Sequence, residues 1–297
     1  MKVALTGATG FIGSHVLTEL RGRGHEVTAF VRDTSKAEIL ADRGATPTVV
    51  DLYDRAAVVR ILRDADAAIH TASPGDATSA DLDSAVADAA IEAFAGSGKP
   101  YLQVSGLWIY GNNSSISEES PIDSPPLVAW REEIERRVLA APGMRAVVIT
   151  AGVAYGEGGG GIPGLLLGSP RDDAGSLIML GSGQQHWATI HVADLATFFR
   201  LALEQESARG RYVIADGQNP TVAEVTEAAA VAAGAPGAVP GSDDEARARV
   251  GDYLAEVLLL DQGAVAANAR DALGWAPSHP GLPDEFRDGS YRKSTAG

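Results

Sequence analysis

The chain has 297 residues, with 24 basic and 39 acidic side chains and a formal net charge of −15. An acidic surface repels phosphate groups, which argues against nucleic acid and anionic membranes as partners and favours a small molecule held by local donors. The absence of cysteine excludes disulfides, thiolate metal sites and a cysteine nucleophile. No segment resembles a signal peptide or a membrane span, so we expect a cytoplasmic protein.

Short β-branched runs alternate with amphipathic runs up to Thr150. Strands are predicted at residues 2–6, 25–32, 46–52, 65–73, 99–106 and 144–150. Helices are predicted between them, at residues 11–24, 35–44, 54–64, 79–98 and 125–141. This alternation is typical of βαβ units and predicts an α/β fold with a Rossmann-type, doubly wound parallel sheet. Ligands of such sheets bind at the carboxyl ends of the strands.

The alternation breaks after Thr150. Residues 156–164, GEGGGGIPG, contain too much glycine for a helix or strand, and we interpret them as a loop, either a slack connector or a substrate lid. We therefore divide the chain into a dinucleotide-binding region, 1–155, and a smaller C-terminal substrate lobe, 156–297. A strand around 211–215 is expected to return to the sheet.

A glycine motif, TGATGFIG, lies between the first predicted strand and the first predicted helix. Gly7 permits a tight turn, Gly10 lets the backbone approach a pyrophosphate, and Gly13 allows close helix–strand packing. The phosphate then sits at the helix N-terminus, where free N–H groups and the helix dipole favour an anion. The alternative is a purely structural turn. The cofactor contacts predicted here are Gly7, Thr9, Gly10, Phe11, Ile12 and Gly13.

The second strand ends in FVRD, where such proteins select their cofactor. An acid here accepts a hydrogen bond from the ribose 2′-OH of NAD, whereas an arginine accommodates the 2′-phosphate of NADP. Arg32, with Lys36 nearby, favours NADP, while Asp33 keeps NAD open as the alternative. No His/Asp/Glu spacing predicts a metal site, and no GxSxG motif predicts a hydrolase.

Several segments resemble the extended short-chain dehydrogenase/reductase superfamily, relatives of NAD-dependent sugar epimerases and dehydratases. They are TGATGFIGSHV, VVDLYD, AAIHTAS, LQVSGLWIYG, AGVAYG, WATIHVADLA and ALGWAPSHPGL, and they cover most of the chain. The resemblance implies that helices 81–95 and 124–141 pair into a homodimer. It also implies further cofactor contacts at Asp51, Leu52, Thr71, Ala72 and Ser73.

The chain departs from this family in SPPLVAWREEIERR. The family's tyrosine, its lysine four residues later and its glutamate eight residues later map onto Leu127, Arg131 and Glu135. Leucine cannot transfer a proton, and arginine can bind ribose hydroxyls but cannot act as a base. The alternative is that Arg131 pairs with Glu135 at the surface. The family's catalytic serine or threonine falls on Gly106, with Ser105 beside it.

Four residues are candidates to replace the lost proton donor or to support it. Ser105 and Arg131 are also predicted to contact the cofactor, and histidine suits general acid work near neutral pH. Each has a structural alternative, such as a strand-end cap or a pocket wall. The candidates are Ser105, Tyr110, Arg131 and His186. Trp108 and Trp130 either form an apolar wall for an aromatic or polyketide-like substrate or belong to the core.

Three functions fit these observations. The first is an NADP-binding oxidoreductase that reduces a carbonyl or conjugated double bond of a small organic molecule. The second is a non-redox isomerase, dehydratase or cyclase on the same scaffold. The third is a nucleotide-binding protein that senses the redox state of its cofactor without catalysis.

Overall fold

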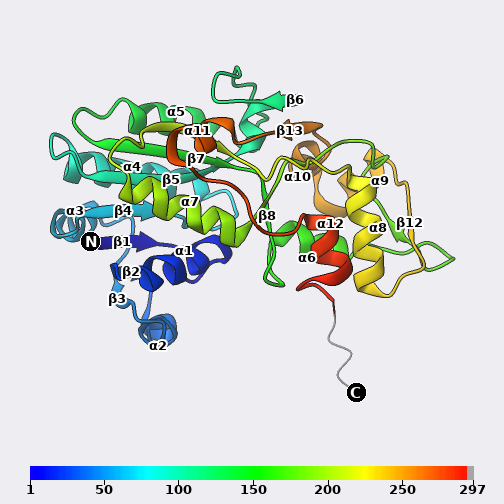
Figure 1. Cartoon of the computed structure of the whole chain (residues 1–297), viewed down its shortest axis with the longest axis horizontal. Coiled ribbons are helices and arrows are strands. Elements are labelled where there is room, and N and C mark those ends of the chain that lie inside the picture. The colour runs from blue at the N-terminus through cyan, green and yellow to red at the C-terminus, as the bar shows by residue number, and fades with distance from the viewer. Residues whose placement is uncertain (293–297) are drawn as a thin grey trace.

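A seven-stranded parallel sheet organises the part of the chain that the computed structural model describes, residues 1–292 (Figure 1). Its strands, from edge to edge, are β3 (Thr46–Val49), β2 (Glu26–Val31), β1 (Lys2–Thr6), β4 (Ala67–His70), β5 (Pro100–Gly106), β7 (Arg145–Ala151) and β11 (Gly210–Ile214). All neighbouring pairs are parallel. The strand order reverses between β1 and β4, which opens a crevice there. The predicted Rossmann-type fold is confirmed.

Helices cover both faces of the sheet. One face packs against α1 (Phe11–Gly22), α7 (Val192–Glu204) and α11 (Ala267–Leu273), and the other against α3 (Arg55–Asp64), α4 (Ser79–Phe94) and α5 (Trp130–Leu139). Side chains alternate between the faces, so Leu102 and Tyr101 belong to different core clusters. Burial on both sides explains the nearly continuous apolar runs of the strands. The edge beyond β2 carries η1 (Thr34–Lys36) and α2 (Ala37–Asp42).

A smaller lobe lies beside the carboxyl ends of the strands (Figure 1). Its helices are α6 (Gly161–Leu167), α8 (Val222–Ala233), α9 (Asp243–Val250), α10 (Asp252–Leu258) and α12 (Leu282–Asp288). Short parallel pairs join its segments: β8 (Val153–Tyr155) with β10 (Thr189–His191), β9 (Leu177–Ile178) with β12 (Ala238–Val239), and β6 (Asn113–Ile116) with β13 (Gln262–Ala264). The 3₁₀-helix η2 (Leu107–Tyr110) follows β5. No helix within residues 1–292 has the length and apolarity needed to span a bilayer.

The prediction that residues 156–164 are entirely irregular was wrong at its end, because α6 begins at Gly161. Ile162, Leu165 and Leu166 recur at helical spacing and pack into the lobe core. Burial of this apolar face outweighs the poor helix propensity of the glycines.

The helix predicted from residue 125 begins only at Trp130. Turns precede it, with the N–H of Val128 donating to Pro125 and the N–H of Arg131 to Val128. Pro125 and Pro126 lack a backbone donor, and each restricts the residue before it, so the helix starts later. Leu127, which was predicted to be helical, therefore lies outside α5.

A buried ion pair anchors α5 to the sheet. Glu135 is completely buried, and Arg211 of β11 donates to its carboxylate at 2.5 Å. The same guanidinium lies 3.4 Å from the hydroxyl of Thr150. The alternative that Arg131 pairs with Glu135 at the surface was therefore wrong, because Glu135 is fully buried and pairs with Arg211.

Replacing Arg211 by methionine should strongly destabilise the fold. The Glu135 carboxylate would remain buried without its partner, which costs about 3–5 kcal/mol. As the control, Arg137→Met removes the partly exposed pair with Asp88, which should cost at most about 1 kcal/mol. Urea unfolding of the two variants measures both free energies, and similar losses would contradict this account.

Candidate functional site

The glycine turn after β1 brings three stretches of backbone together. Gly7 has φ = +75°, and a Cβ there would lie 2.6 Å from the nitrogen of Ala72. A Cβ on Gly13 would collide with the carbonyl of Gly7 and the hydroxyl of Thr71. The N–H of Gly10 closes the turn by donating to Gly7 at 2.8 Å. Only glycine fits Gly7 and Gly13, so the motif sets how closely α1 approaches the strand ends.

The start of α1 suits an anionic group. Gly10 is its N-cap and offers no side-chain acceptor, and the first turn contains no acidic residue. The first N–H groups of the helix therefore have neither a capping side chain nor a nearby carboxylate, and the helix dipole adds positive potential. These features fit the pyrophosphate of a dinucleotide.

A cleft of about 420 Å³ opens beside this turn. It brings together most of the cofactor contacts predicted from the sequence: Gly7, Thr9, Gly10, Arg32, Lys36, Asp51, Leu52, Thr71, Ala72 and Ser73. Phe11, Ile12 and Gly13 instead form the first turn of α1. The prediction missed several further lining residues, among them Phe30, Tyr53 and Asp76. Phe30 is the last but one residue of β2, so its place at the strand end was a usable signal.

The carboxylate at the end of β2 is already engaged. Asp33 accepts from the N–H of Ser35 at 2.8 Å and from its hydroxyl. These hydrogen bonds, aided by the charges of Arg32 and Lys36, lower the pKa of Asp33. Arg32 and Lys36 are exposed on the same cleft wall. The cleft thus presents two cations beside a carboxylate that is held by its own turn.

The end of β5 carries a buried hydroxyl. Ser105 is 5% exposed, and its Oγ has no hydrogen-bond partner within residues 1–292. It pairs in register with Thr150 of β7. A buried polar atom without a partner is uncommon and is compatible with a missing ligand or water.

Neither Ser105 nor the other three catalytic candidates belong to the cleft lining. Tyr110 is buried, which raises its pKa, and it lies close to Arg211 and Glu135. The guanidinium of Arg131 stacks 4.7 Å from the ring centre of Trp130, and its buried Nε has no described partner. His186 is on the surface, and its Nδ1 lies 2.8 Å from Asp261.

The glycine-rich loop that precedes α6 is held by hydrogen bonds to Ser290 and Tyr291. The Tyr291 hydroxyl accepts from the N–H of Gly156 and donates to the carbonyl of Gly159, both at 2.6 Å. The hydroxyl of Ser290 accepts from Gly158 at 2.8 Å. A Cβ on Gly159 would lie 2.5 Å from the ring of Phe11, so the loop packs against the start of α1. We call this arrangement the Tyr291 clasp; its residues are too far apart in sequence for any spacing to reveal it.

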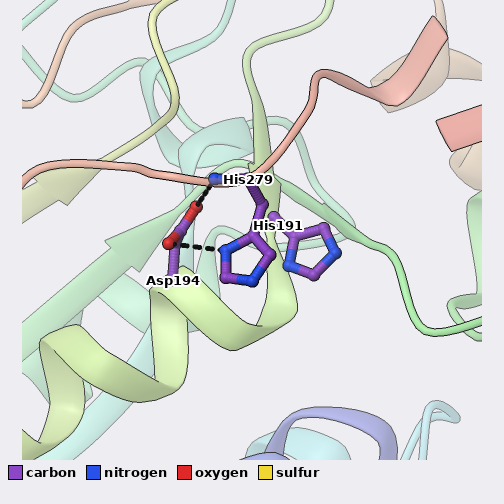
Figure 2. Close-up of side chains that lie close together, drawn as sticks. All are labelled: His191, Asp194 and His279. Atoms are coloured by element: carbon purple, nitrogen blue, oxygen red, sulfur yellow. Dashed lines mark hydrogen bonds and ion pairs between the residues drawn. The ribbon is translucent and has the colours of Figure 1, made fainter. Parts of the chain in front are cut away.

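Two imidazoles and a carboxylate also cluster where α7 begins (Figure 2). The rings of His191 and His279 are parallel and 4.2 Å apart. Their nitrogen lone pairs lie in separate parallel planes and cannot converge on one ion. Both Asp194 oxygens already accept hydrogen bonds from Ser278 and His279, at 2.8–3.1 Å. This cluster ties the 278–279 segment to α7, and its geometry does not suit a metal.

A second hollow, of about 610 Å³, lies at the amino edge of the sheet near Met1 and Pro100. Its Arg145 guanidinium is already bonded to carbonyls of residues 202, 203, 205 and 208. Ligands of parallel sheets bind at the opposite edge, so we assign no function to this hollow.

A family model described as "NAD dependent epimerase/dehydratase family" matches residues 3–215. The chain belongs to this family. The epimerase family protein SDR39U1 of Mus musculus is 30% identical, over 97% of this chain and 99% of its own length. A 3-diazoavenalumate denitrifying reductase of a Streptomyces species is 28% identical, over 99% and 100% of the two chains.

Solved structures share the fold. Human SDR39U1, crystallised with NADPH, has a TM-score of 0.74 and 25% identity, over 98% of this chain and 99% of its own. MoeE5 in complex with UDP-glucose and NAD has a TM-score of 0.75 and 22% identity, over 96% of each chain. These neighbours bind nicotinamide dinucleotides, and the family supports the same cofactor class here.

Replacing Tyr291 by phenylalanine should open the clasp. The N–H of Gly156 would lose its buried acceptor, which costs about 1–3 kcal/mol and should speed its amide exchange about tenfold or more. Tyr253→Phe is the control, because Tyr253 is 63% exposed. Hydrogen exchange followed by mass spectrometry over residues 155–161 measures the effect, and equal rates in the two variants would refute the clasp.

Proposed function

We propose that the protein is an NADPH-dependent oxidoreductase that reduces a carbonyl or conjugated double bond of a small organic molecule. The preference for NADPH over NADH rests on the residues at the end of β2. Asp33 is held by Ser35, while Arg32 and Lys36 face the cleft. Two cations suit a 2′-phosphate, and one oxygen of the Asp33 carboxylate is already engaged by Ser35.

The relatives support this proposal in two ways. Human SDR39U1 was crystallised with NADPH. The Streptomyces relative is named as a reductase. Other neighbours, such as MoeE5, bind NAD and UDP-glucose. The choice of NADP over NAD therefore depends on the residues of this chain.

The residues of the cleft would divide the binding of the cofactor among them. The glycine turn and the start of α1 hold the pyrophosphate, and Asp51 and Leu52 border the adenine. Arg32 and Lys36 bind the 2′-phosphate. Thr71, Ala72 and Ser73, directly after β4, would contact the part of the cofactor that runs from the pyrophosphate toward β5. A bound reduced nicotinamide supplies a hydride, so the reacting end belongs beside β5.

The protein must add a proton where the hydride arrives. Three residues are set aside as the proton donor. Leu127 has no proton to donate, Tyr110 lies beside the Glu135–Arg211 pair, and His186 is engaged by Asp261. We assign the proton to the buried hydroxyl of Ser105, replenished from water. Arg131 would hold the ribose, since its guanidinium is charged and has no acidic partner among residues 1–292.

The expected homodimer stays a prediction. The outer sides of α4 and α5 expose charged residues, namely Asp81, Glu92, Glu132, Glu133 and Arg136. Homodimer interfaces are usually more apolar than these charged helix faces.

Arg32→Gln should weaken NADPH binding about tenfold to hundredfold, because a charge-assisted hydrogen bond contributes roughly 1.5–3 kcal/mol. NADH binding should change little, since it has no 2′-phosphate. Arg60→Gln removes an exposed arginine of α3 and controls for net charge. Fluorescence titration of both nucleotides measures the dissociation constants, and equal losses for NADPH and NADH would count against a 2′-phosphate site.

Ser105→Ala should lower kcat by about a hundredfold or more, because it removes the assigned proton donor, while NADPH binding should change much less. Ser124→Ala is the control, since that hydroxyl already donates to Ile109. Product chromatography against NADPH consumption measures the reaction of wild type and variants. Turnover without NADPH consumption would instead identify a non-redox isomerase, dehydratase or cyclase. Tight binding without any turnover would favour a redox sensor.

A further inference from the structure

The last residue of β5, Gly106, has no conformational reason to be glycine. Its dihedral angles are φ = −138° and ψ = 153°, which every amino acid adopts in a strand. Packing does not require glycine either, because a Cβ there would meet only the carbonyl oxygen of Ala151, at 3.9 Å. By contrast, a Cβ on Gly152, one residue after β7, would lie 2.5 Å from the carbonyl of Ala188. Gly106 therefore leaves unfilled space.

This space lies on the path of the cofactor. β5 neighbours β4, and the residues directly after β4 line the dinucleotide cleft. A cofactor whose pyrophosphate lies at Gly10 and whose adenosine lies beyond β2 extends its other end toward β5. The position of Gly106 relative to the nicotinamide thus rests on the proposed function.

Partly exposed apolar side chains come from the elements around this strand end. Val104 lies two residues earlier on the same face of β5, and both it and Ala154 of β8 pack against the same core cluster. Trp108 contacts the lobe core and also the cluster around Ile109, so it bridges the sheet and the lobe. Junctions of this kind are preferred sites for small-molecule ligands.

Two arginines outside the cofactor cleft, Arg249 of α9 and Arg211 of β11, are already engaged. Arg249 donates to the Leu165 carbonyl and to Ser169, at 2.8 Å for the latter, so it is not free for a substrate anion. Arg211 is paired with Glu135. Glu157 is exposed in the glycine loop and would repel an anion.

We propose that Gly106 opens an apolar subsite beside the reacting end of the cofactor, and that this subsite takes an uncharged aromatic or conjugated group of the substrate. The open strand end admits a flat group, and the Trp108 indole offers it an aromatic face. A larger residue at position 106 would fill the subsite without disturbing the fold.

Gly106→Val tests this with an unreactive probe, naphthalene-2-carboxamide, titrated into the NADPH-loaded protein by isothermal calorimetry. The variant should weaken binding about tenfold or more, as expected for a side chain intruding into an apolar pocket. Gly106→Ala should have a smaller effect, and it remains informative if the valine variant folds poorly. Gly22→Val is the control, because Gly22 also has open space around it but lies at the far end of α1.

The outcomes separate the subsite from the proposed reaction. No binding of the carboxamide to wild type, or equal binding to wild type and Gly106→Val, would overturn the subsite. Turnover of 2-naphthaldehyde and butanal gives a second readout, since Gly106→Val should lower kcat/KM about tenfold for the first and much less for the second. An equal loss for both aldehydes would also overturn it. Consumption of neither aldehyde, together with binding that depends on Gly106, would support the subsite and overturn the reductase.

Discussion

The close contact of three backbones at the end of β1 is the constraint on which the site depends. Gly7 turns the chain against Ala72, and Gly13 lets α1 approach Gly7 with no side chain between them. This contact fixes the helix N-terminus at the crevice where the strand order reverses. The position of the α1 N-terminus and of the cleft wall after β4 both follow from it. A methyl group at either glycine would displace α1 and so change the geometry of the whole cleft.

The sequence was sufficient for the sheet and for most of the cofactor cleft, because local signals encode both. Strands buried on two sides leave apolar runs, and the glycine spacing has meaning only between a strand and a helix. The start of α5 was predicted too early. The apolar periodicity continues through Pro125 and Pro126, but the backbone there forms turns and not a helix. The partner of Glu135 was missed because Arg211 lies on a distant strand, and only the folded sheet brings the two together. The Tyr291 clasp was missed for the same reason.

The region near the end of β5 differs from the cofactor cleft, because its side chains depart from those that the resemblance implies. Leu127 and Gly106 occupy positions where the resemblance implies proton-transfer groups, yet the surrounding framework is intact. Glu135 keeps a buried charged partner, and the strand ends keep their register. The scaffold that holds the dinucleotide is therefore separable from the groups that complete a reaction. Such a site can change its chemistry by exchanging a few side chains at one strand end.

The Tyr291 clasp has a consequence for the order of events during synthesis. Phe11 and the glycine turn leave the ribosome early, whereas the hydroxyl that fastens Gly156 and Gly159 belongs to a residue translated near the end of the described chain. Domains form from the N-terminal side as the chain emerges. The glycine turn after β1 is therefore synthesised long before the residue that holds the loop against it. The packing of this loop against the start of α1 is completed late in synthesis.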